Sequence, residues 1–192
     1  MKLKRLACLY SCLVLGSATP ILAFSAQDKE SRTVGAISVQ HASRAPSLIE
    51  VGRGEMDWLW LSLYKAKLMT ATGRYQQGQY PILLEIEYYR DIDSDDLLQA
   101  TRDQWKQLRF SNTDIEGWLS VLRSIWPDVK QGDHLSFMIV DGQTSQFFYN
   151  QQPLNMINDT HFAEAFLAIW LSPQTSGPSL RAQLLGETSC DC

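Results

Sequence analysis

Two stretches decide the fold: DWLWLSLYKAKL at residues 57–68 and PILLEIEYY at residues 81–89. Successive side chains of a β-strand point to opposite faces, and both stretches follow that two-residue period. The first predicts one strand from residue 57 to residue 68, buried on both faces over its first half. In the second, Glu85 and Glu87 indicate a face in water. The faces of the first strand consist of Trp58, Trp60, Ser62, Tyr64, Ala66 and Leu68 on one side, and of Leu59, Leu61 and Leu63 on the other.

Helical periods follow these strands and return near the end of the chain. Acidic residues from Asp93 onward suit the positive end of a helix dipole, and Thr113 with Glu116 reads as a capping box. Asp141-Gly142 is typical of a tight hairpin turn. The predicted elements are helices from Asp93 and Thr113, a hairpin of strands 134–140 and 143–150, a helix from Asp159 or Thr160, and a short helix over Ser179–Leu185. This grouping predicts an α+β domain with a large antiparallel sheet backed by a layer of helices.

The N-terminal 26 residues have the composition of a secretory signal peptide. Lys2, Lys4 and Arg5 precede an apolar run, and small residues follow it, which favours cleavage after Ser25 with Ala23 three positions before the cut. Polar residues interrupt the run, so a retained membrane anchor is the weaker alternative. We therefore expect an exported, periplasmic protein with a loose lead-in at residues 27–46, an edge strand at Gly35–Val39, a domain at 47–186 and a tail at 187–192.

The charge of the mature chain disfavours nucleic-acid partners. The sequence has 17 Lys+Arg and 21 Asp+Glu, and removal of the leader takes away three cations and no acid, so the net charge moves from −4 to −7. Such a chain repels phosphate backbones. No stable membrane span is expected after the leader is removed, and no pattern indicates an oligomeric state.

No motif predicts a metal, a cofactor or a catalytic group. The three histidines, His41, His134 and His161, are too far apart for metal spacing, and the carboxylates around Asp93 are better explained as helix capping than as a calcium loop. Gly52-Arg53-Gly54 precedes the aromatic strand rather than a helix, which favours a bend or bulge over a phosphate loop. Cys190 and Cys192 fall in the tail, where two thiols without further ligands predict neither a disulfide framework nor a metal site.

Aromatic residues are the richest feature of the apolar faces. Periodic rings build cores and sometimes line ligand cavities, and packing is the simpler explanation. The set comprises Trp58, Trp60, Tyr64, Tyr88, Trp105, Trp118, Trp126, Phe147, Tyr149, Phe166 and Trp170.

Several stretches in order resemble the bacterial chalcone isomerase-like proteins. They include Val51-Gly52-Arg53-Gly54, Leu63-Tyr64-Lys65-Ala66-Lys67-Leu68, Ile86-Glu87-Tyr88-Tyr89-Arg90-Asp91-Ile92, Phe162-Ala163-Glu164-Ala165-Phe166 and Leu184-Leu185-Gly186. The resemblance covers residues 47–186 and implies an open-faced β-sandwich. It also places the catalytic positions of the plant enzymes near Met56 (or Arg53 after a register shift), Ser62, Asp93, Ala100 and Ile169, where most of the required residue types are missing.

Three functions remain open from the sequence. The leading hypothesis, implied by non-enzymatic relatives of the fold, is a non-catalytic protein that binds a fatty acid or another apolar small molecule between sheet and helices. An intramolecular lyase or isomerase with a rearranged site using Tyr88, Arg90 and Asp93 is the second, and a structural or interaction protein without a ligand is the third. For the first, the candidate ligand-binding residues are Arg53, Trp58, Trp60, Ser62, Tyr64 and Tyr88, with Arg53, Ser62 and Tyr64 at the polar end; no metal or cofactor is expected.

Overall fold

The structure is a computed structural model that describes residues 47–58 and 61–189, with the side chain of Trp58 excepted. The predicted leader, the lead-in with its edge strand, Trp60, and the cysteines of the tail lie outside these residues. The described elements are β1 (Ile49–Trp58), β2 (Leu61–Thr70), β3 (Ile82–Tyr88), α1 (Ser94–Gln107), α2 (Asn112–Arg123), β4 (His134–Ile139), β5 (Ser145–Tyr149), β6 (Gln152–Ile157), α3 (Thr160–Leu171) and α4 (Pro178–Leu184).

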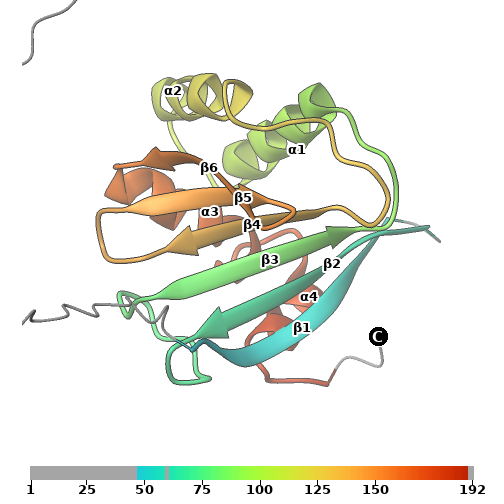
Figure 1. Ribbon diagram of the computed structural model, residues 1–192, viewed down its shortest axis with the longest axis vertical. Coiled ribbons are helices and arrows are strands. Elements are labelled where there is room, and N and C mark those ends of the chain that lie inside the picture. Colours follow the sequence, from blue (N-terminus) through green and yellow to red (C-terminus); the bar gives the residue numbers. More distant parts are fainter. Residues whose placement is uncertain (1–46, 59–60, 190–192) are drawn as a thin grey trace, which may run out of the picture. The chain divides into compact units, whose positions relative to one another are not determined.

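The six strands form one antiparallel sheet in chain order, β1-β2-β3-β4-β5-β6 (Figure 1). Burial along β3 alternates strictly: Leu84 and Ile86 are buried, whereas Glu85 and Glu87 are partly exposed. In β2 the buried face carries Ala66 and Leu68. The predicted α+β architecture with one wet sheet face is therefore confirmed.

The prediction of one strand over residues 57–68 is wrong. β1 ends at Trp58 and β2 begins at Leu61, and these two residues are paired across the strands. Only residues 59–60 separate the strands, so the apolar run contains the end of β1 and the start of β2 rather than one strand buried on both faces. Leu61 and Leu63 are accordingly partly exposed.

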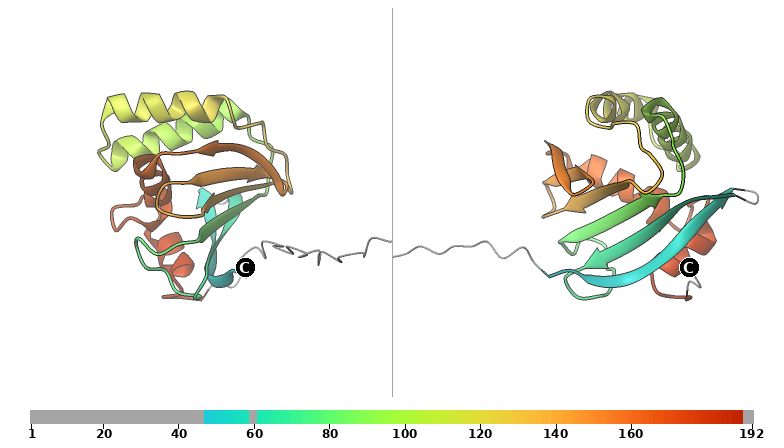
Figure 2. Two further views of the ribbon diagram at one scale, coloured as in Figure 1. Left: turned by 60° about the vertical axis from the view of Figure 1, so that its left-hand side comes forward. Right: turned by 45° about the vertical axis from the view of Figure 1, so that its right-hand side comes forward.

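Helices cover one face of the sheet. α4 packs on β1 and β2, α3 lies next to α4, and the antiparallel pair α1–α2 contacts α3 through α1. Figure 1 shows α3 and α4 behind the sheet, with α1–α2 beyond the β6 end. Figure 2 shows α1–α2 side by side and connected to the sheet only by the segments on either side of the pair. A backbone bridge between Ile92 and Val129 ties these segments together.

The helix caps differ in detail from the predicted ones. α2 begins at Asn112, one residue before the predicted Thr113, because the Ser111 side chain caps it by accepting a hydrogen bond from Asp114 N at 3.1 Å. Asp93 stands at the N-cap of α1 without a side-chain hydrogen bond, and Asp128 instead accepts from Ser94 N at 2.8 Å. Asp159 caps α3 as predicted.

The β4–β5 hairpin is present, but its turn is wider than the predicted two residues. Ile139 pairs with Ser145, and the Asp141 carboxylate accepts from the backbone N–H groups of Gln143 and Thr144 at 2.9 and 2.7 Å. The turn is thus closed by a side chain. β6, which completes the sheet, was not predicted.

Gly52 and Gly54 allow α4 to approach β1 closely. A Cβ on Gly52 would lie 2.1 Å from the backbone oxygen of Gln183, and one on Gly54 would lie 2.7 Å from Leu180 Cδ1. The register shift between Glu50 and Gly52 confirms the predicted bulge. The structure adds a second reason for the glycines, because any side chain there would push α4 off the sheet.

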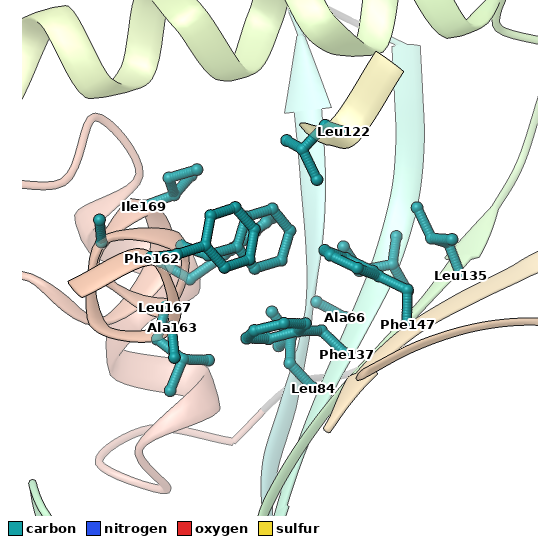
Figure 3. Packing of buried hydrophobic residues seen from close by; sticks show 14 of the residues in the cluster. Ala66, Leu84, Leu122, Leu135, Phe137, Phe147, Phe162, Ala163, Leu167 and Ile169 are labelled. Carbon is teal, nitrogen blue, oxygen red and sulfur yellow. The ribbon is translucent and has the colours of Figure 1, made fainter. Parts of the chain in front are cut away.

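The core is dense with aromatic rings between β4, β5 and α3. Phe137 and Phe147 from the sheet meet Phe162 and Phe166 from α3, with ring centroids 4.6 to 6.2 Å apart. Figure 3 shows Phe137, Phe147 and Phe162 among aliphatic side chains from the sheet and from α3. All four rings are at most 2% exposed, so this part of the interior is filled by packing.

Candidate functional site

Hydrogen-bonding side chains enter the helix-covered face at one end of β2 and β3. Tyr64 and Tyr88 are paired across these strands, with ring centroids 6.1 Å apart in an edge-to-face contact. Trp170 from α3 reaches down from the helical layer, and its Nε1–H donates to the Tyr64 hydroxyl at 2.9 Å. We call Tyr64, Tyr88 and Trp170 the tyrosine–tryptophan cluster.

Both hydroxyls of the cluster are held in their protonated form. Burial raises the pKa of Tyr64 to about 12, although the hydrogen bond from Trp170 acts in the opposite direction. Burial also raises the pKa of Tyr88, with Tyr64 adding to the effect. A protonated phenol donates one hydrogen bond. Among the described residues, neither hydroxyl donates to an acceptor, so both donors are available to a ligand oxygen.

Tyr64 is the less buried tyrosine of the cluster. Tyr88 is 5% exposed, whereas Tyr64 is partly exposed and pairs with Met56 of β1. Gly177, in the link between α3 and α4, lies against Met56: a Cβ there would be 3.1 Å from Met56 Cε. The end of β1 and the α3–α4 link are therefore packed together beside Tyr64.

The other candidate residues are not gathered at this cluster. Arg53 faces the uncovered side of the sheet, where it pairs with Glu50 at 2.5 Å, and its hydrogen bond lowers the pKa of Glu50. The Ser62 hydroxyl donates to Asp57 at 2.6 Å. Trp60 and the Trp58 side chain lie outside the described residues. The structure thus brings together Tyr64 and Tyr88, but not Arg53 or Ser62 with them.

The residues of the alternative enzymatic site are not assembled either. Tyr88 points into the interior, while Arg90 and Asp93 are exposed on the segment that leads to α1. Of the positions that correspond to the plant enzymes, Ala100 is exposed and Ile169 is buried, and neither can donate a side-chain hydrogen bond. No arrangement of an acid, a base and an anion-binding group is formed by these residues.

The carboxylates whose pKa values are displaced have structural partners. Hydrogen bonds from Tyr149, Asn150 and the backbone of Lys130 lower the pKa of Asp133. Backbone hydrogen bonds from Gln131 and Ser94 do the same for Asp91 and Asp128, respectively. These acids hold the two segments that connect α1–α2 to the sheet. In the described part of the chain, no three His, Cys, Asp or Glu side chains are grouped closely enough to hold a metal ion.

Two surface depressions are present among the described residues, and both lie outside the helix–sheet interior. One, of about 400 Å³, is a shallow and polar hollow between the start of β1 and the end of α4, lined by Arg53 and Gln183 among others. The second, of about 180 Å³, lies on the uncovered sheet face among charged side chains that include Lys65, Lys67 and Glu87. Neither suits an apolar molecule, so a ligand at the cluster must displace packed side chains.

Two tryptophans matter here that sequence reasoning did not include among the candidate ligand-binding residues. Trp170 supplies the donor to Tyr64, and the four-residue spacing of Phe166 and Trp170 on α3 is the signal that places them on one helix face. Trp126, just after α2, has a buried Nε1 with no hydrogen-bond partner among the described residues. No sequence pattern indicates that unsatisfied donor.

Comparisons with known proteins found a matching family, a similar sequence and a similar fold. The sequence pattern of the family described as chalcone isomerase-like matches residues 56–186. An uncharacterized protein of Haemophilus influenzae is 28% identical over 138 residues, which cover 72% of this chain and 68% of that protein. A solved structure, the fatty-acid binding protein 1 of Arabidopsis thaliana, has a TM-score of 0.57 at 9% identity and covers 74% of this chain and 89% of that one. The last likeness shows the fold. In the described residues, no helix is both long and apolar enough to cross a membrane.

Proposed function

This chain belongs to the chalcone isomerase-like family, and from that premise we propose that it is a non-catalytic binding protein for a fatty acid or another apolar molecule with an acidic or carbonyl oxygen. The observation that carries the proposal is the tyrosine–tryptophan cluster. It presents two protonated hydroxyls inside an otherwise apolar layer, as a site for an amphipathic ligand requires.

Two further observations support binding over catalysis. The Arabidopsis protein of similar fold carries the name of a fatty-acid binding protein. In this chain the exposed Arg90 and Asp93 stand apart from Tyr88, and nonpolar Ala100 and Ile169 occupy positions where the plant enzymes orient their substrate. Without oriented hydrogen-bonding groups, the preorganisation that such an isomerisation depends on is missing.

A structural or interaction role without a ligand is the second candidate. It is favoured by the packed interior, where Phe137, Phe147, Phe162 and Phe166 are at most 2% exposed, and by the polar lining of the two depressions on the outside. The two candidate functions predict different responses of the ligand-free protein to an added ligand. A binding protein rearranges side chains at the cluster when it is offered a ligand, whereas an interaction protein does not.

Direct binding is tested by native mass spectrometry and by tryptophan fluorescence with palmitic acid. We expect a mass increase of one palmitate and a change in emission, because Trp170 lies in the cluster. Replacing Tyr88 with phenylalanine removes one donor to the ligand oxygen, and the dissociation constant should rise about tenfold, the size expected for a hydrogen bond to a charged group.

The matched control for this test is Tyr89→Phe. Tyr89 is the next residue of the chain and faces the uncovered side of the sheet, where its hydroxyl donates to Glu55 at 2.7 Å. Its replacement should leave palmitate affinity unchanged. An absence of binding by the wild-type protein would reject the proposed function, and equal losses in both variants would place the ligand elsewhere.

Export is a separate part of the proposal and rests on the composition of residues 1–26. The protein recovered from a periplasmic fraction is expected to begin at Ala26, which N-terminal sequencing would reveal. Ala23→Arg puts a large side chain three positions before the cut and should leave the leader attached. Recovery of a full-length chain from the cytoplasm of the wild-type strain would contradict the assignment.

A further inference from the structure

The indole of Trp126 is an anomaly in an otherwise satisfied interior. Its Nε1 is buried, and it is the one side-chain nitrogen or oxygen so enclosed that lacks a hydrogen-bond partner among the described residues. The two other tryptophans of the α1–α2 pair are satisfied by α3: Trp105 donates to the Ala165 carbonyl at 2.8 Å, and Trp118 donates to Asp159 at 3.3 Å. A buried donor without an acceptor is destabilising and is rare in folded proteins.

The two rings that contact Trp126 offer no polar partner to a buried water. The ring contacts Phe147 and Phe166 edge to face, with centroids 5.5 and 5.9 Å away. Neither phenyl has a polar atom, whereas an ordered internal water generally needs two to four polar partners. A phenyl face accepts an N–H only weakly. A ligand oxygen would satisfy the indole and bring its own apolar surface to the phenyl rings.

Trp126 is connected to the tyrosine–tryptophan cluster by a row of touching rings. Phe166 contacts Trp126 on one side and Trp170 on the other, with centroids 5.9 and 5.2 Å apart, and Trp170 bonds to Tyr64. The row therefore has hydrogen-bond donors at both ends and a phenyl ring between them. A molecule that displaced the packed side chains along this row would meet the Tyr64 and Tyr88 hydroxyls at one end and the indole N–H at the other.

We propose that Trp126 Nε1–H is a second ligand anchor, and that the ligand class is an apolar acid with an additional oxygen along its chain, such as an oxo or hydroxy fatty acid. This inference rests on the proposed function and narrows it. A plain fatty acid can satisfy the cluster but leaves the indole without an acceptor, whereas a mid-chain oxygen satisfies both. A site built to bond an oxygen discriminates against the analogue that lacks it.

The test compares palmitic and stearic acids with stearic acids that carry an oxo group at successive mid-chain positions, using the full mature protein. We expect the best oxo acid to bind at least about tenfold more tightly than stearic acid, from one additional buried hydrogen bond. Trp126→Phe should abolish that preference while retaining binding of stearic acid. The control Trp118→Phe removes an indole that already has an acceptor and should keep the preference.

The outcomes separate the two proposals. If neither plain nor oxo acids bind the wild-type protein, the proposed function fails. If both bind equally, or if the preference survives in Trp126→Phe, binding stands and the role of Trp126 is rejected. Melting temperatures of both variants are measured alongside, because loss of ring packing alone should lower them similarly without changing the ratio of the two affinities.

Discussion

Replacing Phe147 with alanine is expected to lower the free energy of unfolding by about 3–5 kcal/mol, the usual cost of removing a buried phenyl ring. Phe147 is fully buried and touches Phe137, Phe162 and Phe166, so its loss would leave a cavity that rings from two elements border. These partners belong to a rigid strand and a well-packed helix, and the space can collapse only in part. Urea unfolding followed by tryptophan fluorescence would measure the change.

The neighbouring residue provides the control. Phe148 points to the uncovered face of the sheet and is partly exposed, and it pairs with Ser136 rather than with the aromatic core. Because a partly exposed ring loses less on truncation, Phe148→Ala should cost about 1 kcal/mol. Equal losses for the two variants would mean that the side chains of β5 are not divided between a core face and a wet face.

The second large effect is expected from one added methyl group. Gly52→Ala should lower the free energy of unfolding by about 3 kcal/mol, at the upper end of the range for overpacking. The new Cβ would stand 2.1 Å from the backbone oxygen of Gln183, and backbone cannot rotate away as a side-chain tip can. α4 would have to separate from β1, exposing Leu180 and Leu184, which are now buried.

Gly117 offers a matched substitution with the opposite sign. It lies within α2, and a Cβ there meets nothing within 4 Å. Because alanine restricts the unfolded chain and favours helix, Gly117→Ala should raise the free energy of unfolding by about 0.5–1 kcal/mol. Thermal and urea denaturation of the two variants would measure both changes in the free energy of unfolding. If Gly52→Ala left this free energy unchanged, α4 would not pack against Gly52 as closely as described.

Much of the fold follows from periodicity because β3, α1 and α3 each present an apolar set of the right spacing. The β1–β2 link could not be found in this way. It falls within a run of tryptophan and leucine that contains no glycine, proline or asparagine to mark a turn, so two strands merged into one. β6 was missed for the opposite reason: most of its side chains are exposed and Pro153 interrupts its pattern, features of an edge strand that needs little apolar signal.

The candidate site was predictable only in part. Tyr64 and Tyr88 belong to the alternating apolar positions of their two strands, so the two-residue period places them correctly on the helix-covered face. On β1, Gly52 and Gly54 lie against α4, so the alternation of side chains places Arg53 on the opposite, uncovered face. The face of Arg53 could be recognised only once the packing of α4 was known. The donor from Trp170 comes from a residue 106 positions away, and no local pattern encodes such a contact.

The order of the strands has a consequence for how the chain folds. Every strand pairs with its neighbour in sequence, and apart from β3–β4, whose connection contains α1 and α2, each pairing closes only a short stretch of chain and loses little entropy. The packing of α4 on β1 is different, because it joins the first and last elements of the described domain. During synthesis the sheet can grow strand by strand, but β1 keeps its glycine-lined surface open to solvent until α4 has left the ribosome. Completion of the fold therefore awaits the synthesis of α4.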